Sequence, residues 1–196
     1  MSESREKLIK AAANLFLRQS YQGTGVGEIL QATGLSKGSF YHFFPSKEDL
    51  GLAVVAQQRD RTFAFWAKSL TQDGVSAPKR LAHLLDSIAR RMEAGAFALG
   101  CPLGTMAQEM SSMSAPLREA LEEAMTRQEG LLARCLREGQ EAGEIPKTFP
   151  AEDMARCLWS SVQGALLMAK ARRSTAPLED VKWLYAAILS PGNAAQ

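Results

Sequence analysis

The stretch GVGEILQATGLSKGSFYHFFPSKEDL, residues 25–50, predicts two short helices joined by a tight turn. Apolar residues recur at helical spacing over residues 26–33, and a glycine that follows them begins the turn. A second helix is expected from Lys37 to about Phe43. It ends before Pro45, because proline lacks an amide hydrogen and disfavours a helical residue before it. The next residues, SKED at 46–49, match a capping box and predict the start of a further helix.

The second of these helices carries residues that suit DNA recognition. A recognition helix enters the major groove by its N-terminal turn, which must present small or polar residues. Lys37, Gly38 and Ser39 offer a cation, close backbone approach and a hydroxyl. Phe40 and Phe43 are expected to anchor the opposite side in the core. Donors along the flanks, where phosphates would lie, are Tyr41, His42 and Lys47.

Local charge favours a DNA contact, although the total charge does not indicate one. The formal net charge is +2, which is only mildly basic. No Asp or Glu lies between Glu28 and Glu48, so the turn and second helix have no negative side chain. Two expected helix N-termini, near Val26 and Lys47, would also attract phosphate.

Composition indicates an all-α protein. The 196 residues include 54 Ala and Leu but only 11 Val and Ile, which favours helix because β-branched residues suit a pleated sheet. Hydrophobic residues make up 46% and charged residues 22%, and these proportions exclude a disordered or low-complexity chain.

Cysteine usage and the absence of targeting patterns predict a cytoplasmic protein. The three cysteines are widely spaced without a CxxC pair, so neither a disulfide framework nor a metal site is expected. No secretory signal and no apolar run long enough to cross a membrane is visible. Phosphate-binding loops and hydrolase motifs are missing as well, so neither a cofactor nor an enzyme activity is expected.

The chain is expected to divide into a head of three short helices, residues 1–45, and a six-helix body, residues 46–196. In the head, an apolar stripe from Leu8 predicts a first helix that ends near Ser20. The body helices are expected at about residues 46–70, 79–94, from 102 onward, 114–143, 151–173 and 177–189.

Residues 11–50, AAANLFLRQSYQGTGVGEILQATGLSKGSFYHFFPSKEDL, resemble the DNA-binding head of the TetR family of bacterial transcriptional repressors. The most specific part is GLSKGSFYHFFPSKEDL, residues 34–50. With GCPLGTMAQEMS at 100–111 and QGALLMAKA at 163–171, the resemblance covers nearly the whole chain, although the motifs outside the head are less specific.

The resemblance implies a set of DNA contacts. Nearest the base edges it places Lys37, Gly38 and Ser39, and on phosphate or sugar it places Thr24, Tyr41, His42 and Lys47. Two positions depart from the family. Ser20 stands where a glycine usually ends the first helix, and a left-handed residue there costs a side chain about 1 kcal/mol. Gly25 stands where Ser or Thr is common, so one phosphate contact is expected to be missing.

The last two helices are expected to form a dimer interface. The helix at 151–173 is apolar nearly all round, and its small residues would allow close approach of another helix. With the resemblance, this favours a two-fold homodimer through the eighth and ninth helices over a thick monomeric core. Two heads on a two-fold axis would read a palindrome with half-sites about 34 Å apart or a multiple of that distance.

The body is expected to hold a cavity for a hydrophobic or aromatic small molecule. Candidate lining residues are soft and apolar with few polar groups, although each alone is more often plain core. They are Phe63, Trp66, Met92, Met106, Met110, Met125, Gln128, Trp159 and Gln163.

Cys101 is a candidate redox or electrophile sensor. It precedes Pro102 at an expected helix start, where the helix dipole favours a thiolate. Lys170 is the only charge in an otherwise apolar stretch and is a candidate partner for it. The alternative is an inert, half-buried thiol.

The sequence therefore predicts a ligand-responsive transcriptional regulator, with repression as the first hypothesis and activation as the second. It would bind a palindromic double-stranded operator as a homodimer and leave it when a hydrophobic inducer binds or Cys101 is modified. Two rivals remain: a small-molecule or partner-binding helical protein without operator recognition, and a helical enzyme that uses the cavity.

Overall fold

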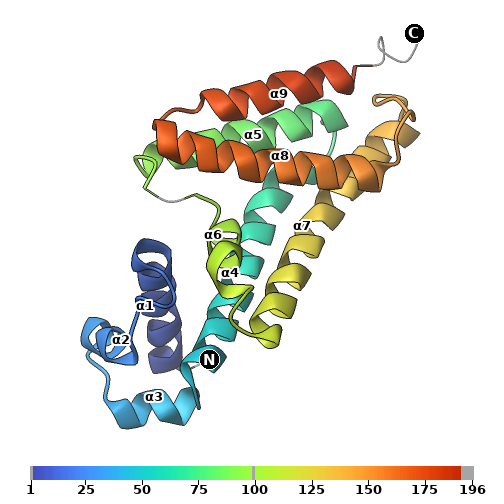
Figure 1. The fold of residues 1–196 in the computed structure, drawn as a ribbon. Coiled ribbons are helices and arrows are strands. Elements are labelled where there is room, and N and C mark those ends of the chain that lie inside the picture. Colours follow the sequence, from blue (N-terminus) through green and yellow to red (C-terminus); the bar gives the residue numbers. More distant parts are fainter. Residues whose placement is uncertain (1, 99, 191–196) are drawn as a thin grey trace. The chain divides into compact units, whose positions relative to one another are not determined.

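The computed structural model describes residues 2–98 and 100–190, which form nine α-helices and no strand (Figure 1). In chain order they are α1 (Glu3–Gln19), α2 (Val26–Thr33), α3 (Lys37–Phe43), α4 (Lys47–Leu70), α5 (Ala77–Ala94), α6 (Pro102–Met110), α7 (Ala115–Glu141), α8 (Ala151–Arg172) and α9 (Ala176–Ile188). The prediction of an all-α fold is confirmed. Within these described residues, every helix is too short or too polar to cross a bilayer.

The chain divides into two compact units. The first comprises Met1–Arg61 and Pro102–Met125, and the second comprises Thr62–Cys101 and Thr126–Gln196. The helices expected at residues 1–45 lie in the first unit together with α6, while α4 and α7 contribute residues to both units.

The core of the head is built on α1. Its apolar stripe is buried and includes Leu8, Ala12 and Phe16, as the sequence predicts. α1 packs against α2, α3 and α6. The ring of Tyr21, in the turn after α1, meets the Phe16 ring edge-on with centroids 4.9 Å apart.

Two helix ends in the first unit agree with the sequence analysis. Ser46 caps α4, because its Oγ accepts the Asp49 amide hydrogen at 3.1 Å and donates to the Asp49 carboxylate at 2.7 Å. The expected start of a helix after Ser46 is therefore confirmed, although Asp49 accepts from the Ser46 hydroxyl and not from the Ser46 amide, as a complete capping box would have it. Ser20 has φ 78° and ψ 162°, a conformation that costs a non-glycine residue about 1–3 kcal/mol. Its oxygens offset part of this cost by accepting hydrogen bonds from Gly23 N at 3.0 Å and Thr24 Oγ1 at 2.6 Å.

The second unit is organised around α9, which packs against α8 and α5 (Figure 1). α8 buries one face that includes Leu158, Val162 and Leu166. Lys182 of α9 reaches across to Asp86 of α5, with 2.6 Å between Nζ and Oδ1. These contacts hold the last two helices against the rest of the body.

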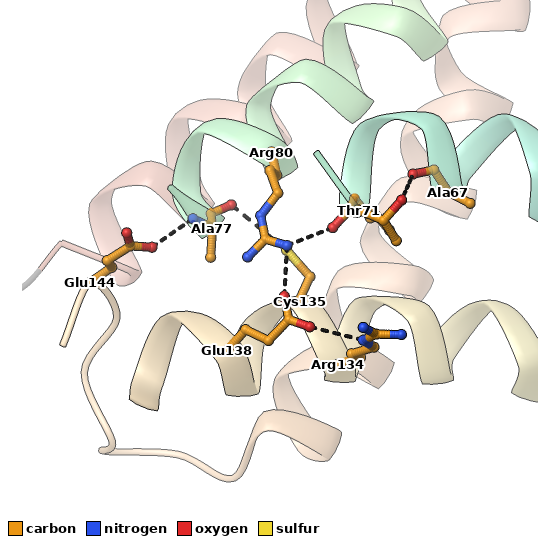
Figure 2. Close-up of polar contacts among 9 residues, drawn as sticks. Ala67, Thr71, Ala77, Arg80, Arg134, Cys135, Glu138 and Glu144 are labelled. Atoms are coloured by element: carbon orange, nitrogen blue, oxygen red, sulfur yellow. Dashed lines mark hydrogen bonds and ion pairs between the residues drawn. The ribbon is translucent and has the colours of Figure 1, made fainter. Parts of the chain in front are cut away.

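A buried arginine joins the ends of three helices in this unit (Figure 2). Arg80, near the start of α5, donates from Nη1 to the carbonyl of Leu70 at 2.8 Å and to Glu138 at 2.7 Å. Arg134 donates to the other oxygen of Glu138 at 2.9 Å. The α5 N-terminus is closed by Glu144, which accepts the Ala77 amide hydrogen at 2.7 Å.

This cluster also requires close packing. A Cβ atom at Gly139 would lie 2.6 Å from Ala77 Cβ and 2.7 Å from Ile145 Cδ1, so α7 and the start of α5 approach only because residue 139 is glycine. The Arg80 cluster, defined as Arg80, Arg134, Glu138 and Glu144, therefore fixes where α7 meets α5.

Glu138→Gln is expected to lower the free energy of unfolding by about 1–2 kcal/mol at neutral pH, because it deprives a buried guanidinium of its carboxylate. Hydrogen bonds from Arg80 and Arg134 hold the pKa of Glu138 below its usual range. The stabilisation is therefore present above the pKa of an unfolded Glu and is lost as the pH falls through the lowered pKa. Urea unfolding at neutral and acidic pH should show the parent and variant converging on acidification.

Glu152→Gln is the matched control, because Glu152 also pairs with an arginine, Arg137, but both side chains are about half exposed. It should leave the unfolding curve unchanged at neutral pH. An equal loss in the two variants would contradict the role given to the buried Arg80.

Candidate nucleic-acid interface

The rotation of α3 about its axis is set by two buried aromatic rings. Phe40 is 0% exposed and Phe44 is 2% exposed, and their ring centroids lie 6.1 Å apart. Ser36 caps the helix, since its Oγ accepts the Ser39 amide hydrogen at 3.1 Å. With one face buried and the N-terminus capped, the opposite face of α3 is left for a partner.

That opposite face carries most of the side chains predicted to contact DNA. Lys37, Gly38, Tyr41 and His42 are exposed, and Ser39 is half-buried. Lys37 Nζ lies 6.0 Å from the centroid of the Tyr41 ring, so a cation and a phenol sit on one side of the helix.

The glycine of this face is not required by packing within the chain. A Cβ atom at Gly38 would meet only Ser36 Oγ, at an ordinary 3.8 Å. A glycine that the protein's own interior does not need is consistent with close approach of an outside surface to the backbone.

Thr24 lies differently from the sequence expectation. It is 0% exposed, its hydroxyl donates to the Ser20 carbonyl at 2.6 Å and its amide donates to the Tyr21 carbonyl at 3.3 Å. The expected phosphate contact therefore loses support, because both donors are used inside the turn between α1 and α2.

Lys47, at the first position of α4, is half-buried against an aromatic ring. Its Nζ lies 4.3 Å from the centroid of the Tyr21 ring. Burial lowers the pKa of Lys47, while the carboxylates of Glu109 and Glu28 act in the opposite direction. The ammonium thus remains near the head surface, positioned by Tyr21.

The sequence analysis missed Glu109, which holds the turn between α1 and α2 from α6. Its two carboxylate oxygens accept the amide hydrogens of Tyr21 at 2.8 Å and Gln22 at 2.7 Å. No local pattern indicates this contact, because the acceptor stands 88 residues after Tyr21.

The N-terminus of α2 is also capped by an acidic residue. Glu28 accepts the amide hydrogen of Gly25 at 2.7 Å and a hydrogen bond from Gln19 Nε2 at 3.0 Å. These bonds lower the pKa of Glu28, the Gly25 bond most. Because this carboxylate already occupies the α2 N-terminus, that terminus is less suited to phosphate than the sequence analysis expects.

The candidate ligand-lining residues fall into both units. Phe63, Trp66, Met92, Gln128, Trp159 and Gln163 belong to the second unit, and Met106, Met110 and Met125 to the first. The structure brings Trp66 and Trp159 together edge-on, with ring centroids 5.1 Å apart. Met110 is fully buried in the first unit, where a Cβ atom at Gly51 would lie 3.4 Å from its Cε.

The three cysteines differ in their surroundings. Cys101 is buried immediately before α6, Cys135 is buried in α7, and Cys157 is exposed on α8. Burial raises the pKa of Cys135 to about 11, despite the opposing effect of Arg80, so this thiol stays protonated at neutral pH. Lys170 is exposed on α8, and its pairing with Cys101 stays a prediction. Among the described residues, no group of three or more His, Cys, Asp or Glu is arranged to hold a metal ion.

α8 and α9 expose large apolar side chains. They are Leu167, Met168, Trp183, Leu184 and Ile188, of which Trp183 is 72% exposed. These side chains lie on helices that pack against each other and, through α9, against α5, so the exposed apolar surface belongs to the outer side of this packing.

Both the N-terminal and the C-terminal part of the chain match known protein families. Residues 8–54 match the family described as bacterial regulatory proteins, tetR family, and residues 77–183 match the tetracyclin repressor-like C-terminal domain. The transcriptional regulator AcuR of Cereibacter sphaeroides is 33% identical over 90% of this chain and 81% of its own length.

Two further proteins extend the similarity to solved structures. The transcriptional repressor NemR of Escherichia coli is 30% identical over 91% of this chain and 89% of its own length. The crystal structure of its reduced form superposes with a TM-score of 0.87 at 25% identity, over 97% of this chain and 98% of that one. A regulatory protein TetR from Rhodobacter sphaeroides gives a TM-score of 0.88 at 27% identity, over 95% and 99% of the two chains.

Proposed function

Because the chain belongs to the TetR family of bacterial regulatory proteins, we propose that it is a homodimeric repressor of transcription that binds a palindromic operator. In this proposal residues 1–45 bind DNA, helped by Lys47 at the start of α4, and residues 46–196 bind an inducer and form the dimer. The protein acts in the cytoplasm, where its operator lies. A small hydrophobic molecule, or modification of Cys101, releases it from DNA.

The exposed face of α3 is the observation that carries the proposal. Burial of Phe40 and Phe44 leaves Lys37, Gly38 and Tyr41 facing outward. No acidic residue occurs from 29 to 47, so nothing on this stretch repels phosphate. Lys37, Gly38 and Ser39 are proposed to meet base edges, and Tyr41, His42 and Lys47 to meet the DNA backbone.

The exposed apolar face of α8 and α9 supports the dimer. Burying Trp183 and Leu167 against a second copy would remove a large apolar surface from water. A two-fold axis pairs each patch with itself and presents two heads to two half-sites. The relatives named as repressors, NemR of Escherichia coli and DhaR of a Mycobacterium species, support repression as the outcome.

Inducer binding or modification of Cys101 is proposed to act on the head through the turn that contains Tyr21. Both Glu109 of α6 and Lys47 of α4 contact this turn, so a shift of either helix would alter the contacts that hold Tyr21 in place. α6 begins directly after Cys101, and a group added to this buried thiol would displace the start of α6. That NemR of Escherichia coli is described in a reduced form supports a redox-dependent state in this chain. A coupling of about 1–3 kcal/mol would weaken operator binding roughly 5- to 150-fold.

Selection of bound fragments from a random duplex pool is expected to return a palindrome, with half-site centres about 34 Å apart or a multiple of that distance. The symmetry follows from two heads on one two-fold axis. Sedimentation of the protein on the selected duplex should give one dimer per palindrome. If no fragment is enriched, even at low ionic strength, operator recognition is excluded and a helical binding protein without DNA recognition remains.

Lys47→Ala is expected to weaken binding to specific and unrelated duplexes alike, because it removes a phosphate contact from each head. The slope of log affinity against log salt should fall in magnitude by roughly 2 per dimer. Lys68→Ala removes an exposed lysine from the last turn of the same helix and serves as the matched control, with no change expected. An unchanged salt slope for Lys47→Ala would disprove its phosphate contact. Changes at Ser39 are expected to act differently, altering sequence preference rather than the slope.

Cys101→Ala is expected to abolish release of the operator by iodoacetamide or hydrogen peroxide, because no thiol then remains at the start of α6. The parent should lose operator affinity roughly 5- to 150-fold after treatment. The control Cys157→Ala removes the exposed thiol of α8 and should respond like the parent. Equal responses of Cys101→Ala and the parent, measured by gel retardation, would exclude sensing by Cys101.

A further inference from the structure

Gln128, in the middle of α7, has a fully buried side-chain amide. It has 0% exposure, and neither its Oε1 nor its Nε2 has a partner among the described residues. One helical turn to either side lie Ala124 and Leu132, both fully buried. Gln128 is therefore a polar group set into the apolar, buried face of α7.

Such a group is unusual, because a glutamine amide donates two hydrogen bonds and accepts two, and buried polar groups are almost always paired. Gln140, on the same helix, shows the ordinary arrangement. Its Nε2 donates to the carbonyls of Pro146 at 3.0 Å and Phe149 at 2.9 Å. Within the part of the chain that the structure describes, Gln128 therefore keeps free the two Nε2 donors that Gln140 uses inside the protein, and its Oε1 acceptor as well.

A second amide in the same unit has an unpaired nitrogen. The Nε2 atom of Gln163 of α8 is buried and has no hydrogen-bond partner among the residues that the structure describes. Gln163 stands one turn after Trp159, whose ring meets Trp66 of α4 at 5.1 Å. On the α7 side, Arg127 lies with its Cζ 4.1 Å from the centroid of the Phe63 ring of α4, so α4 and α7 are neighbours at the level of Gln128.

The charge around Gln128 restricts what it binds. Among the described residues, Arg80 is the one buried charged residue of the second unit, and it is engaged by Leu70 and Glu138. Glu138 lies ten residues beyond Gln128, about 15 Å along the helix. Arg127, next to Gln128 in the chain, is exposed, so a charged ligand group at Gln128 would lose its hydration without a buried counter-charge among the described residues.

We infer that Gln128 is the polar anchor of a ligand site in the second unit, for an uncharged molecule whose hydrogen-bond donor stands next to an acceptor. Carboxamides, lactams and imides have this pattern and pair with both atoms of the amide, whereas ketones and esters satisfy only Nε2. The rest of the ligand is apolar or aromatic, as suits the tryptophan pair. This inference rests on the proposed function and specifies the chemistry of its inducer.

The test uses Gln128→Leu in the 196-residue protein, with benzamide, benzoate and acetophenone as probes. Without a probe, the variant should unfold at the same temperature as the parent or a higher one, because it replaces an unpaired amide by an apolar group of similar size. In the parent, benzamide at millimolar concentration should raise the unfolding temperature more than benzoate or acetophenone. The variant should bind benzamide at least about tenfold more weakly, as measured by titration calorimetry.

Gln140→Leu is the matched control on the same helix. It should lower the unfolding temperature, because it removes two hydrogen bonds, and it should leave benzamide affinity unchanged. The inference is overturned if Gln128→Leu destabilises the protein as Gln140→Leu does. It is also overturned if benzamide fails to bind the parent, as a trapped water at Gln128 would predict, or binds no better than benzoate or acetophenone.

Operator binding separates this inference from the proposed function. Gln128→Leu should retain the operator affinity of the parent, because residue 128 lies outside the head. Normal operator binding without benzamide binding overturns the ligand chemistry alone. Failure of the parent to bind any duplex overturns the proposed function, whatever the probes do.

Discussion

Burial of Phe40 and Phe44 fixes which side of α3 faces the solvent, and the proposed DNA contacts depend on it. A seven-residue helix has too few internal hydrogen bonds to be stable alone. Its orientation therefore comes from packing, with α1 supplying the apolar surface beneath it. Lys37, Gly38 and Tyr41 are exposed together because the rings of Phe40 and Phe44 are buried on the other side of the helix.

Local chemistry explains why much of the fold is predictable from the sequence. Pro45 ends α3, and Ser46 and Asp49 start α4, through contacts that span only a few residues. The positive φ of Ser20 likewise agrees with its place at the end of the apolar stripe, where the resemblance to the TetR family implies a left-handed residue. Signals of this kind need no knowledge of the tertiary structure.

Contacts between distant segments could not be predicted in the same way. Helical periodicity shows that Glu138 is on a helix, but not that Arg80, 58 residues away, lies against it. Thr24 has the residue type of a phosphate ligand, yet the turn uses its hydroxyl internally. The sequence predicts Gln128 as a lining residue of the ligand cavity only because of its residue type. That its amide has no partner among the described residues is a property of the packed helices.

The carboxylate of Glu109 means that the three-helix head is not a self-contained module. The amides of Tyr21 and Gln22 find their acceptor in a segment more than eighty residues further along the chain. A chimeric regulator that grafts only α1 to α3 onto another body would leave these two amides dependent on solvent. Exchanging specificity between relatives thus requires the graft to include α6, or a receiving scaffold with an acid at the corresponding place.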